Sequence, residues 1–350
     1  MPSPVALITG INGQDGSYLA ELLLEKGYAV HGIRRRVSAP STANIDHLRG
    51  EGSALTLHFG DMDDTAGLMR TLELTQPDEV YNLAAQSHVG LSFKAPEQTA
   101  NIDGLGAVRM LESIRRIDSA RRMRFFQATS SEMFAGNPSG PQNEDTPFHP
   151  RSPYGVAKLY AHWITVNHRE AHGMHASSGI MFNHESPRRG EGFVTRKITR
   201  AVAAIHLGRQ DRLALGDLDA ARDWGHARDY AEGMWRMLQQ AEADDYVLAT
   251  GVTHTVRQFV EAAFQETGTQ LAWEGTRVEE RGRCTASGRI LVQVDPAFFR
   301  PTQGGGVAGD AAKAGRVLGW RPGTAFGALV AEMVRSDLAR LAAPAPAQGA

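Results

Sequence analysis

Four side chains in the first half of the chain have the types and spacing needed to oxidise an alcohol. Tyr154 and Lys158 stand one helical turn apart, and Ser130 and Glu132 precede them, directly after an apolar, strand-like segment. A tyrosine becomes a base only when its anion is stabilised, and a lysine one turn along the same helix face supplies that stabilisation. The serine hydroxyl can orient a substrate hydroxyl. We therefore expect a dehydrogenase-like centre.

Glu132 adds a second acid–base group to this centre. A carboxylate beside the serine could move a proton after the alcohol has been oxidised, so the same site could run a second reaction. Simpler interpretations remain open: Glu132 could cap a helix or lie on the surface at a strand end, and Tyr-x-x-x-Lys pairs also arise by chance. The expected place of Glu132, at the edge of a parallel sheet where ligands bind, favours a role in chemistry.

A glycine-rich turn near the amino terminus is typical of dinucleotide binding. Residues 7–16 (LITGINGQDG) place a glycine at every third position after a strand-like run and open a helical pattern. Such glycines allow a tight turn, the approach of a pyrophosphate and close packing of helix on strand. The spacing G-x-x-G-x-x-G differs from the usual G-x-G-x-x-G, and a plain turn is the alternative. The cofactor-binding residues expected here are Gly10, Asn12, Gly13, Gln14, Asp15 and Gly16.

The end of the second strand predicts which cofactor binds. An NAD enzyme usually has Asp or Glu there to hold the ribose 2′-hydroxyl, whereas this chain has Arg34, Arg35 and Arg36. Guanidinium groups fit a 2′-phosphate, so NADP is predicted, with a solvated basic surface as the alternative. Further cofactor contacts are expected after the third and fourth strands, from Asp61, Met62, Leu83, Ala85 and Ser87.

Alternating apolar and amphipathic segments predict the scaffold that positions these residues. They indicate an α/β fold with a Rossmann-type, doubly wound parallel sheet. We expect residues 1–182 to form the cofactor domain, 183–341 mainly a smaller, interleaved α/β substrate lobe, and 342–350 a disordered tail. Strands are expected at 5–9, 29–33, 55–59, 79–83, 125–128 and 178–182, and helices at 17–26, 65–75, 100–117, 153–172, 227–241, 255–267 and 324–341.

Composition limits the class of protein. The chain has 350 residues, 42% of them hydrophobic and 22% charged, with a formal net charge of −2. This balance argues against general binding to nucleic acid or membrane surfaces, and no apolar run approaches a membrane span. Cys284 is the only cysteine, and neither His184 nor His226 has metal-ligand partners at usable spacing. We expect a cytoplasmic enzyme that contains no disulfide and no metal.

Several separated segments together resemble the GDP-mannose 4,6-dehydratase family of the extended short-chain dehydrogenases/reductases. The resemblance runs from about Val5 to Val334 and includes GINGQDGSYL (10–19), YNLAAQSHV (81–89), PRSPY (150–154), FNHESPRRG (182–190), FVTRK (193–197) and RDWGHA (222–227). It implies a redox-neutral conversion of GDP-mannose to GDP-4-keto-6-deoxymannose with NADP. Tyr154 would take the C4 hydroxyl proton as the hydride leaves C4. Glu132 would then remove the C5 proton and assist loss of the C6 hydroxyl as water, before hydride returns to C6.

The resemblance also implies binding residues and an assembly. A homodimer through the helices at 100–117 and 153–172 is the expected minimum, and a tetramer is possible. As an alternative to cofactor binding, Arg188 and Arg189 could pair with Glu185 and Glu191. The substrate contacts carried over are Ser87, Glu132, Asn183, Lys197, Arg222 and Arg283, and the additional cofactor contacts are His184 and Arg189.

The chain departs from the family pattern at a few positions. Ser130 replaces a threonine but keeps the hydroxyl, and Gln98 stands where the family has a tyrosine. Asn44 replaces an arginine in a loop (37–44) that reaches a neighbouring subunit in relatives, and 300–306 (RPTQGGG) lacks the usual glutamate after the threonine. A nucleotide-sugar 4-reductase or 4-epimerase is the nearest alternative function, although neither needs an acid at Glu132. A non-catalytic sensor would be expected to lose the tyrosine, the lysine or the acid.

Overall fold

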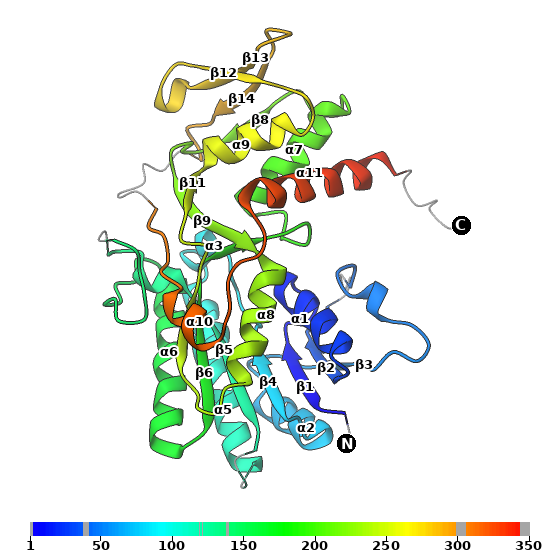
Figure 1. Ribbon diagram of the computed structural model, residues 1–350, viewed down its shortest axis with the longest axis vertical. Helices are drawn as coiled ribbons and strands as arrows, with labels where there is room; N and C mark the ends of the chain where they lie inside the picture. The colour runs from blue at the N-terminus through cyan, green and yellow to red at the C-terminus, as the bar shows by residue number, and fades with distance from the viewer. Residues whose placement is uncertain are drawn as a thin grey trace. The chain divides into compact units, whose positions relative to one another are not determined.

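The chain divides into two units, each assembled from segments that are separate in the sequence. The structure, a computed structural model, describes residues 3–37, 42–118, 120, 122–137, 140–298 and 306–343. Unit 1 consists of Met1–His184, Ala227–Gly251 and Gly309–Gly323, and unit 2 of Glu185–His226, Val252–Ala308 and Thr324–Ala350 (Figure 1). Residues 38–41 of the altered loop, residues 300–305 and the expected tail from residue 344 lie outside the described residues.

Unit 1 is built on a seven-stranded parallel sheet with the order β10-β6-β5-β4-β1-β2-β3. The strand order reverses between β1 and β4, and dinucleotides bind at such a switch point. The predicted α/β class with a Rossmann-type sheet is confirmed. The strands are β1 (Val5–Thr9), β2 (Ala29–Arg34), β3 (Leu55–Phe59), β4 (Glu79–Asn82), β5 (Arg124–Ser130), β6 (His175–Met181) and β10 (Asp245–Leu248).

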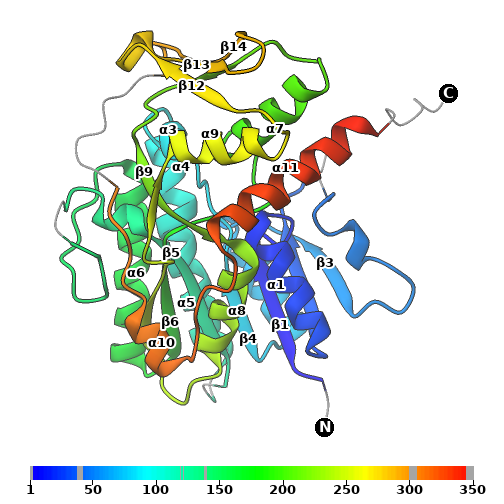
Figure 2. The ribbon, with the colours of Figure 1, turned by 45° about the horizontal axis from the view of Figure 1, so that its top comes forward.

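Helices cover both faces of this sheet. α1 (Gln14–Glu25) and α8 (Ala227–Leu238) lie side by side on one face, while α2 (Thr65–Thr75), α5 (Gly106–Ile117) and α6 (Pro153–His172) cover the other (Figures 1 and 2). Each face therefore has its own apolar core. The shorter helical elements are η1 (Asp46–Leu48), α3 (Val89–Ser92), α4 (Pro96–Thr99), the π-helical η2 (Ala100–Leu105), η3 (Ser131–Phe134) and α10 (Ala312–Val317).

Local sequence signals fix both ends of α6, the helix predicted to carry Tyr154 and Lys158. The side chain of Ser152 accepts a hydrogen bond from the Gly155 N–H at 3.0 Å, and Pro153 occupies the first turn, where its missing N–H costs nothing. Gly173 ends the helix with a φ of 62°, a left-handed conformation that favours glycine. Because the helix begins at residue 153, Tyr154 lies in its first turn.

Unit 2 combines two small groups of strands with three helices. β9 and β11 pair antiparallel, and a second sheet has the order β12-β13-β14-β8. One apolar core joins α7, α9 and α11 to these strands. The elements are β8 (Leu213–Leu215), β9 (Ala221–His226), β11 (Thr253–Thr255), β12 (Leu271–Glu274), β13 (Arg281–Cys284), β14 (Ile290–Val294), η4 (Arg277–Glu279), α7 (Val194–His206), α9 (Val256–Gln265) and α11 (Phe326–Ala342), with β7 (Asn183–Glu185) at the division between the units.

Some expected boundaries differ from those observed. The helix expected at 100–117 begins as the π-helical η2 and continues as α5, and α1 begins three residues earlier than expected. α7 was not predicted at all. Helix α11 extends to Ala342, so the first residue of the expected tail is helical. Strand β5 extends to Ser130, which makes this serine the last residue of a sheet strand.

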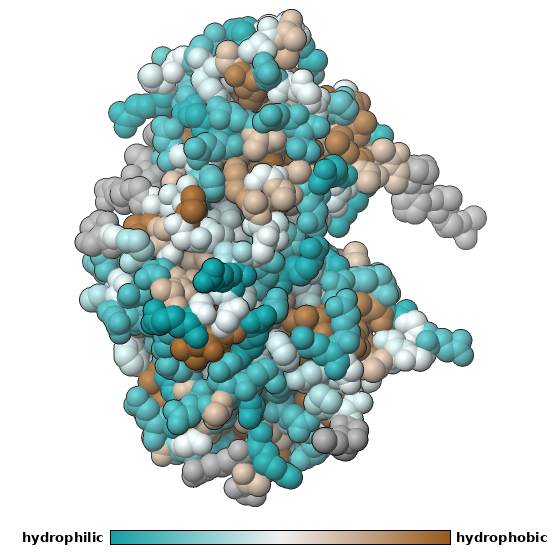
Figure 3. Space-filling view, viewed as in Figure 1, coloured by the Kyte–Doolittle hydropathy of each residue, from teal (hydrophilic) through white to brown (hydrophobic). Residues whose placement is uncertain are grey.

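Within the described ranges, no helix combines the length and the apolarity that crossing a bilayer requires. The face drawn in Figure 3 is mainly hydrophilic, and its apolar residues form small separate groups.

Candidate active site

The predicted dinucleotide turn joins β1 to α1 and has no room for side chains. Gly10 has a φ of +69°, and a Cβ there would lie 2.9 Å from the Cα of Ala84. A Cβ on Gly16 would lie 2.5 Å from the Gly10 carbonyl oxygen and 2.6 Å from the Cα of Ile11. Gly13 caps α1, and its N–H donates to Gly10 O at 2.9 Å. The turn therefore presents main chain and a helix N-terminus, as a pyrophosphate site requires.

Thr9 links the carboxyl ends of β1 and β4. Its hydroxyl donates to Asn82 Oδ1 at 2.7 Å and accepts the Leu83 and Ala84 N–H groups at 3.0 Å. These bonds hold the segment that contains Leu83 and Ala85 against the glycine turn. Ser87, which follows in this segment, is exposed. The role of Thr9 was not predicted from the sequence.

Three of the predicted cofactor residues come together beside the turn. Gln14 Nε2 donates to Asp15 Oδ1 and to the His184 carbonyl oxygen, both at 3.0 Å. His184 Nε2 lies 2.9 Å from Asp15 Oδ2, and its Nδ1 lies 2.7 Å from Phe182 O. The imidazole stacks on Tyr230 with 4.6 Å between ring centroids. His184 is thus a buried, hydrogen-bonded residue at the start of α1, 169 residues from Asp15 in the sequence.

Of the three arginines at the end of β2, one packs against a ring and two are exposed. Arg34 lies over the Phe59 ring at 4.6 Å, whereas Arg35 and Arg36 are exposed. After β3, Asp61 Oδ1 accepts the N–H of Met62 at 2.7 Å.

Asn44, at the end of the altered loop, contacts the glycine turn. Its Nδ2 donates to the Asn12 carbonyl oxygen at 3.2 Å. The residue that departs from the family pattern is therefore joined to the predicted cofactor turn of its own chain.

The four predicted catalytic residues converge where β5 ends and α6 begins. Ser130 Oγ accepts the Glu132 N–H at 3.2 Å, which starts the short helix η3. A Cβ on Gly155 would lie 2.7 Å from the Glu132 carbonyl oxygen, so η3 packs directly on the first turn of α6, beside Tyr154. Ser130 and Glu132 are half-buried and Tyr154 is buried. Ser130, the main chain of Glu132 and the first turn of α6, which carries Tyr154, thus lie together at the carboxyl edge of the sheet.

Lys158 is buried behind Tyr154. Its ammonium group donates to the Ala128 carbonyl oxygen at 3.0 Å and lies 5.7 Å from the centroid of the Tyr154 ring. Burial lowers the pKa of Lys158, while the charges of Asp103 and Asp15 raise it. The positive charge therefore acts at short range on the phenol through a poorly solvated environment.

Asp103, which was not among the predicted site residues, faces this lysine. It lies on η2, is buried, and accepts the Gln86 N–H at 2.6 Å. Burial raises its pKa to about 6, and Lys158 lowers it in part. The sequence signal that could have identified Asp103 is an acidic residue on the otherwise apolar inner face of a predicted helix.

The predicted substrate residues of unit 2 lie on separate elements. Lys197, on α7, lies over the Phe298 ring at 4.1 Å, and burial lowers its pKa. Arg222, on β9, donates to the Ala221 carbonyl oxygen at 2.7 Å. Arg283 is held on the β12–β13 hairpin by Glu274 at 2.7 Å. Asn183, the remaining substrate candidate, is a half-buried residue of unit 1 at the start of β7.

Arg188 and Arg189 have a structural alternative to cofactor binding, namely pairing with Glu185 and Glu191. One of these contacts, between Arg189 and Glu185, is present. Arg189 Nε lies 3.1 Å from Glu185 Oε2, and its guanidinium stacks over Phe193 at 3.6 Å. Glu191 pairs with Arg200. Arg189 therefore makes structural contacts within unit 2.

Comparison with known proteins identifies the family. The model of the family described as GDP-mannose 4,6 dehydratase matches residues 7–333. A GDP-mannose 4,6-dehydratase of Sinorhizobium fredii (strain HH103) is 59% identical over 96% of this chain and 97% of its own length. A GDP-mannose 4,6 dehydratase of Homo sapiens is 52% identical over 96% of this chain and 92% of its own length.

Solved structures with much lower identity share the fold. RMD from Pseudomonas aeruginosa, complexed with NADPH, has a TM-score of 0.76 at 22% identity and covers 97% of this chain and 100% of its own. DesIV, a dTDP-glucose 4,6-dehydratase from Streptomyces venezuelae, has a TM-score of 0.79 at 22% identity and covers 95% of this chain and 96% of its own. With a family model over nearly the whole length and relatives more than half identical, the chain belongs to the GDP-mannose 4,6-dehydratase family.

Proposed function

We propose that the chain removes water from GDP-mannose and yields GDP-4-keto-6-deoxymannose with no net oxidation. Family membership supports this activity. The observation that carries the proposal is the position of Glu132: its main chain packs on Gly155, beside Tyr154, and its N–H bonds Ser130. This position favours a carboxylate close to the residues proposed to oxidise the alcohol. Elimination of water needs a group there that can take a proton from C5 and give one to the leaving hydroxyl.

In the first step the C4 hydroxyl is oxidised. Ser130 orients this hydroxyl, and Tyr154 takes its proton as the hydride leaves C4. The ammonium group of Lys158, 5.7 Å from the Tyr154 ring centroid, stabilises the phenolate that acts as the base. The resulting C4 ketone makes the hydrogen on C5 acidic.

In the second step Glu132 carries out the elimination. Its carboxylate removes the C5 proton, and the protonated form then assists departure of the C6 hydroxyl as water. C6 then receives the hydride that left C4, and C5 receives a proton that balances the one taken by Tyr154, so the product has lost one water and remains at the oxidation level of the substrate. Neither a 4-reductase nor a 4-epimerase needs this acid, and Glu132 therefore favours dehydration over both.

We propose NADP as the cofactor. The fit rests on the turn of Gly10, Gly13 and Gly16, where any Cβ would meet main-chain atoms within 3.1 Å, so only main chain lines the pyrophosphate cradle. When bound, NADP supplies the acceptor and donor of the hydride. Arg35 and Arg36, exposed at the end of β2, are available to a 2′-phosphate. The remaining proposed contacts are Asn12, Gln14, Asp15, Asp61, Met62, Leu83, Ala85, Ser87, Tyr154, Lys158, His184 and Arg189.

We further propose that cationic residues of unit 2 bind the GDP moiety. Lys197, Arg222 and Arg283 carry the charge that a diphosphate requires, and Asn183 and Ser87 supply polar contacts. Arg283 would have to leave Glu274 to do so. Its hairpin pair is half-exposed, and an exposed pair costs little to break.

A helix surface of unit 1 supports a homodimer. Val156, Tyr160 and Trp163 form an exposed apolar stripe along α6, with exposed fractions of 56%, 43% and 55%. A groove of about 720 Å³ is lined by Val156 and Tyr160 of this stripe and by Leu105 of η2. We propose that a second copy of the chain packs on this surface. An exposed apolar stripe marks an interaction surface, and in a twofold dimer the same stripe of each subunit meets its counterpart.

The activity is tested by incubation of the purified chain with GDP-mannose and a catalytic amount of NADP+, followed by mass spectrometry of the nucleotide sugar and absorbance of NADPH. We expect loss of one water without accumulation of NADPH. Net oxidation of the sugar, or an unchanged mass, would show that the proposed function is wrong.

The role of Glu132 is tested by Glu132→Gln, with Glu170→Gln as the matched control. Glu170 is an exposed glutamate on α6, so it loses the same charge away from the proposed centre. Glu132→Gln should still bind GDP-mannose and should lower the rate of water loss by roughly 10²–10⁴-fold, the usual contribution of a general acid–base group. An unaffected rate would make Glu132 structural.

The choice of cofactor is tested by the double variant Arg35→Ala, Arg36→Ala, with Arg49→Ala as the control for loss of a surface arginine. Calorimetry should show NADP+ affinity weakened about tenfold or more and NAD+ affinity unchanged, because each lost charge-assisted hydrogen bond contributes about 1.5–3 kcal/mol. Equal weakening for both cofactors would contradict a 2′-phosphate contact.

A further inference from the structure

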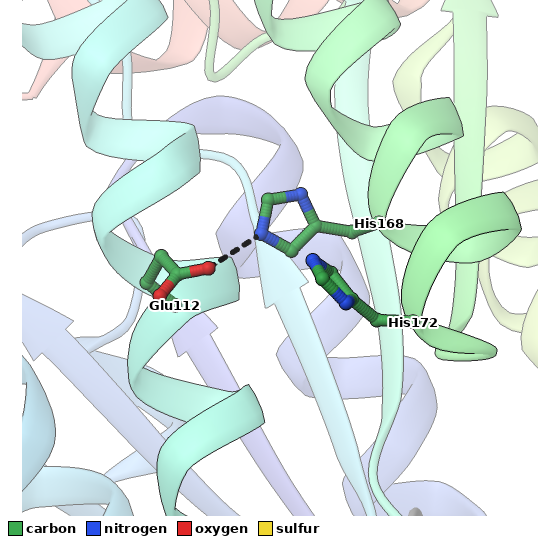
Figure 4. A group of neighbouring side chains, drawn as sticks. All are labelled: Glu112, His168 and His172. Atoms are coloured by element: carbon green, nitrogen blue, oxygen red, sulfur yellow. Dashed lines mark hydrogen bonds and ion pairs between the residues drawn. The ribbon is translucent and has the colours of Figure 1, made fainter.

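Two histidines and a glutamate meet between α5 and α6, far from the proposed catalytic centre. Glu112 lies on α5, and His168 and His172 lie one turn apart on α6, with their rings on the side of the helix that faces Glu112 (Figure 4). One ligand atom from each residue lies within 4.8 Å of the other two. His168 is buried and the other two residues are half-buried. Along α6, Tyr154 lies about 21 Å from His168, at a rise of 1.5 Å per residue.

Hydrogen bonds fix the orientation of His168 toward Glu112. Its Nδ1 lies 2.8 Å from the Ile164 carbonyl oxygen, which can only accept, so Nδ1 carries a hydrogen. Its Nε2 lies 3.1 Å from Glu112 Oε1, a distance that either a shared proton or a metal ion can bridge. Nε2 and Oε1 are therefore the ligand atoms that these two residues would offer to an ion.

We propose that Glu112, His168 and His172 bind a divalent transition-metal ion of the zinc class. Two imidazoles and one carboxylate form a donor set that zinc uses in proteins. The backbone bond of His168 Nδ1 is the outer contact that usually fixes the orientation of a metal-binding imidazole. A cavity of about 210 Å³, lined in part by His172 and Arg115, adjoins the histidine pair.

Arg115 is the competitor for this site. Its Nε donates to Glu112 Oε1 at 2.9 Å and its Nη2 donates to Oε2 at 2.7 Å. The Arg115 side chain is 41% exposed, so it can keep Oε2 and release Oε1, or turn into water, at little cost. Arg116 lies farther from the carboxylate, at 3.9 Å. The bound ion would then join the carboxyl-terminal parts of α5 and α6.

No such site is predicted from the sequence because Glu112 and His168 are 56 residues apart. The histidine pair alone has the i, i+4 spacing of metal-binding helices. Only the packing of α5 against α6 supplies the third ligand.

The proposal is tested by titration of Zn²⁺ into the tag-free, chelator-treated chain by isothermal calorimetry, and by visible absorption after addition of Co²⁺. We expect one ion per chain. His172→Gln and Glu112→Gln should each weaken Zn²⁺ binding at least about tenfold. Loss of a residue that only hydrogen-bonds a metal ligand already costs that much, and these two residues would be ligands themselves. His206→Gln, which removes an exposed histidine on α7, should leave the affinity unchanged.

Thermal unfolding separates loss of the site from loss of the fold. Zn²⁺ should raise the melting temperature of the parent chain and of His206→Gln but not of His172→Gln, because an ion bound only to the folded state stabilises that state. Far-UV circular dichroism confirms that the variants are folded. Absence of stoichiometric binding, or equal Zn²⁺ affinity of His172→Gln and the parent chain, would overturn the proposal. These measurements do not depend on the proposed dehydratase activity.

Discussion

At the scale of single residues, the candidate site contains two buried side chains of opposite charge, Lys158 beside Tyr154 and Asp103 on η2. Lys158 and Asp103 are 3% and 2% exposed, and each charge offsets part of the desolvation of the other. Asp103 also holds the Gln86 N–H, in the segment that follows β4. The ammonium group of Lys158 thus lies 5.7 Å from the Tyr154 ring centroid in a buried environment. The cost of burying both side chains is that the Asp103 carboxyl group ionises with difficulty.

The raised pKa of Asp103 predicts a specific dependence of stability on pH. Between pH 3.8, the ordinary value, and about 6, the folded chain keeps a proton on Asp103 that the unfolded chain has lost. Stability therefore falls as pH rises through this window. Asp103→Asn keeps an acceptor for Gln86 but cannot ionise. Relative to this variant, the parent chain should lose on the order of 3 kcal/mol between acid and neutral pH.

Urea unfolding at a series of pH values measures this difference. Asp63→Asn, at an exposed aspartate, is the control and should follow the parent chain at every pH. Parallel curves for the parent chain and Asp103→Asn would contradict a raised pKa at this position.

The residues of the site differ in how well the sequence predicts them. Ser130, Glu132, Tyr154 and Lys158 are recognisable because strand and helix patterns place them at one sheet edge, where the structure brings them together. Asp103 and the Thr9 bridge depend on packing between elements that are distant in the sequence. The same holds for Arg283, whose bond to Glu274 follows from the register of β12 and β13 and from no local motif.

At the scale of elements, boundaries are predictable where capping signals are local. Strands β1 and β3 and helices α2 and α6 have the predicted limits. Asp64 begins α2 by accepting the Gly67 N–H at 2.9 Å, and Ser152 does the same for α6. α7 has no side-chain cap and follows a loop rich in arginine and glycine, so its amphipathic pattern was missed. The π-helical start of the α5 segment likewise has no sequence signature.

The close packing of α1 on the glycine turn predicts the effect of one added methyl group. Gly16→Ala would place Cβ against Gly10 O and Ile11 Cα, both main-chain atoms that cannot move without distorting the turn. We expect a loss of about 1–3 kcal/mol in the free energy of unfolding, the usual cost of overpacking. Urea denaturation measures it.

Gly327→Ala is the matched control for this substitution. Gly327 lies in the first turn of α11, with nothing within 4 Å of its Cβ position. Its replacement should leave stability unchanged or raise it by up to about 1 kcal/mol. If Gly16→Ala proved as stable as the parent chain, the turn would have to be looser than its geometry indicates.

At the scale of the whole molecule, unit 1 is completed by segments that return from later in the chain. Ala227–Gly251 contributes α8, which packs beside α1, and the edge strand β10. Gly309–Gly323 adds Trp320, whose indole N–H donates to the Asp229 carbonyl oxygen at 2.7 Å. Met234 and Trp320 belong to the same apolar core as the first strands. The dinucleotide fold therefore cannot be complete before most of the chain has been made.

The exposed stripe on α6 predicts how the chain associates. Under twofold symmetry Tyr160, 43% exposed, would lie close to the same surface of the partner, so Tyr160→Glu would bury two carboxylates in an apolar contact. Burial of unpaired like charges costs several kcal/mol, which corresponds to a dissociation constant raised on the order of a hundredfold or more. Leu74→Glu adds the same charge at a residue of α2 that is 72% exposed and should leave the assembly intact. Sedimentation equilibrium should show dimers for the parent chain and Leu74→Glu and monomers for Tyr160→Glu at micromolar concentration. A monomeric parent chain, or a dimer that tolerates Tyr160→Glu, would place the interface elsewhere.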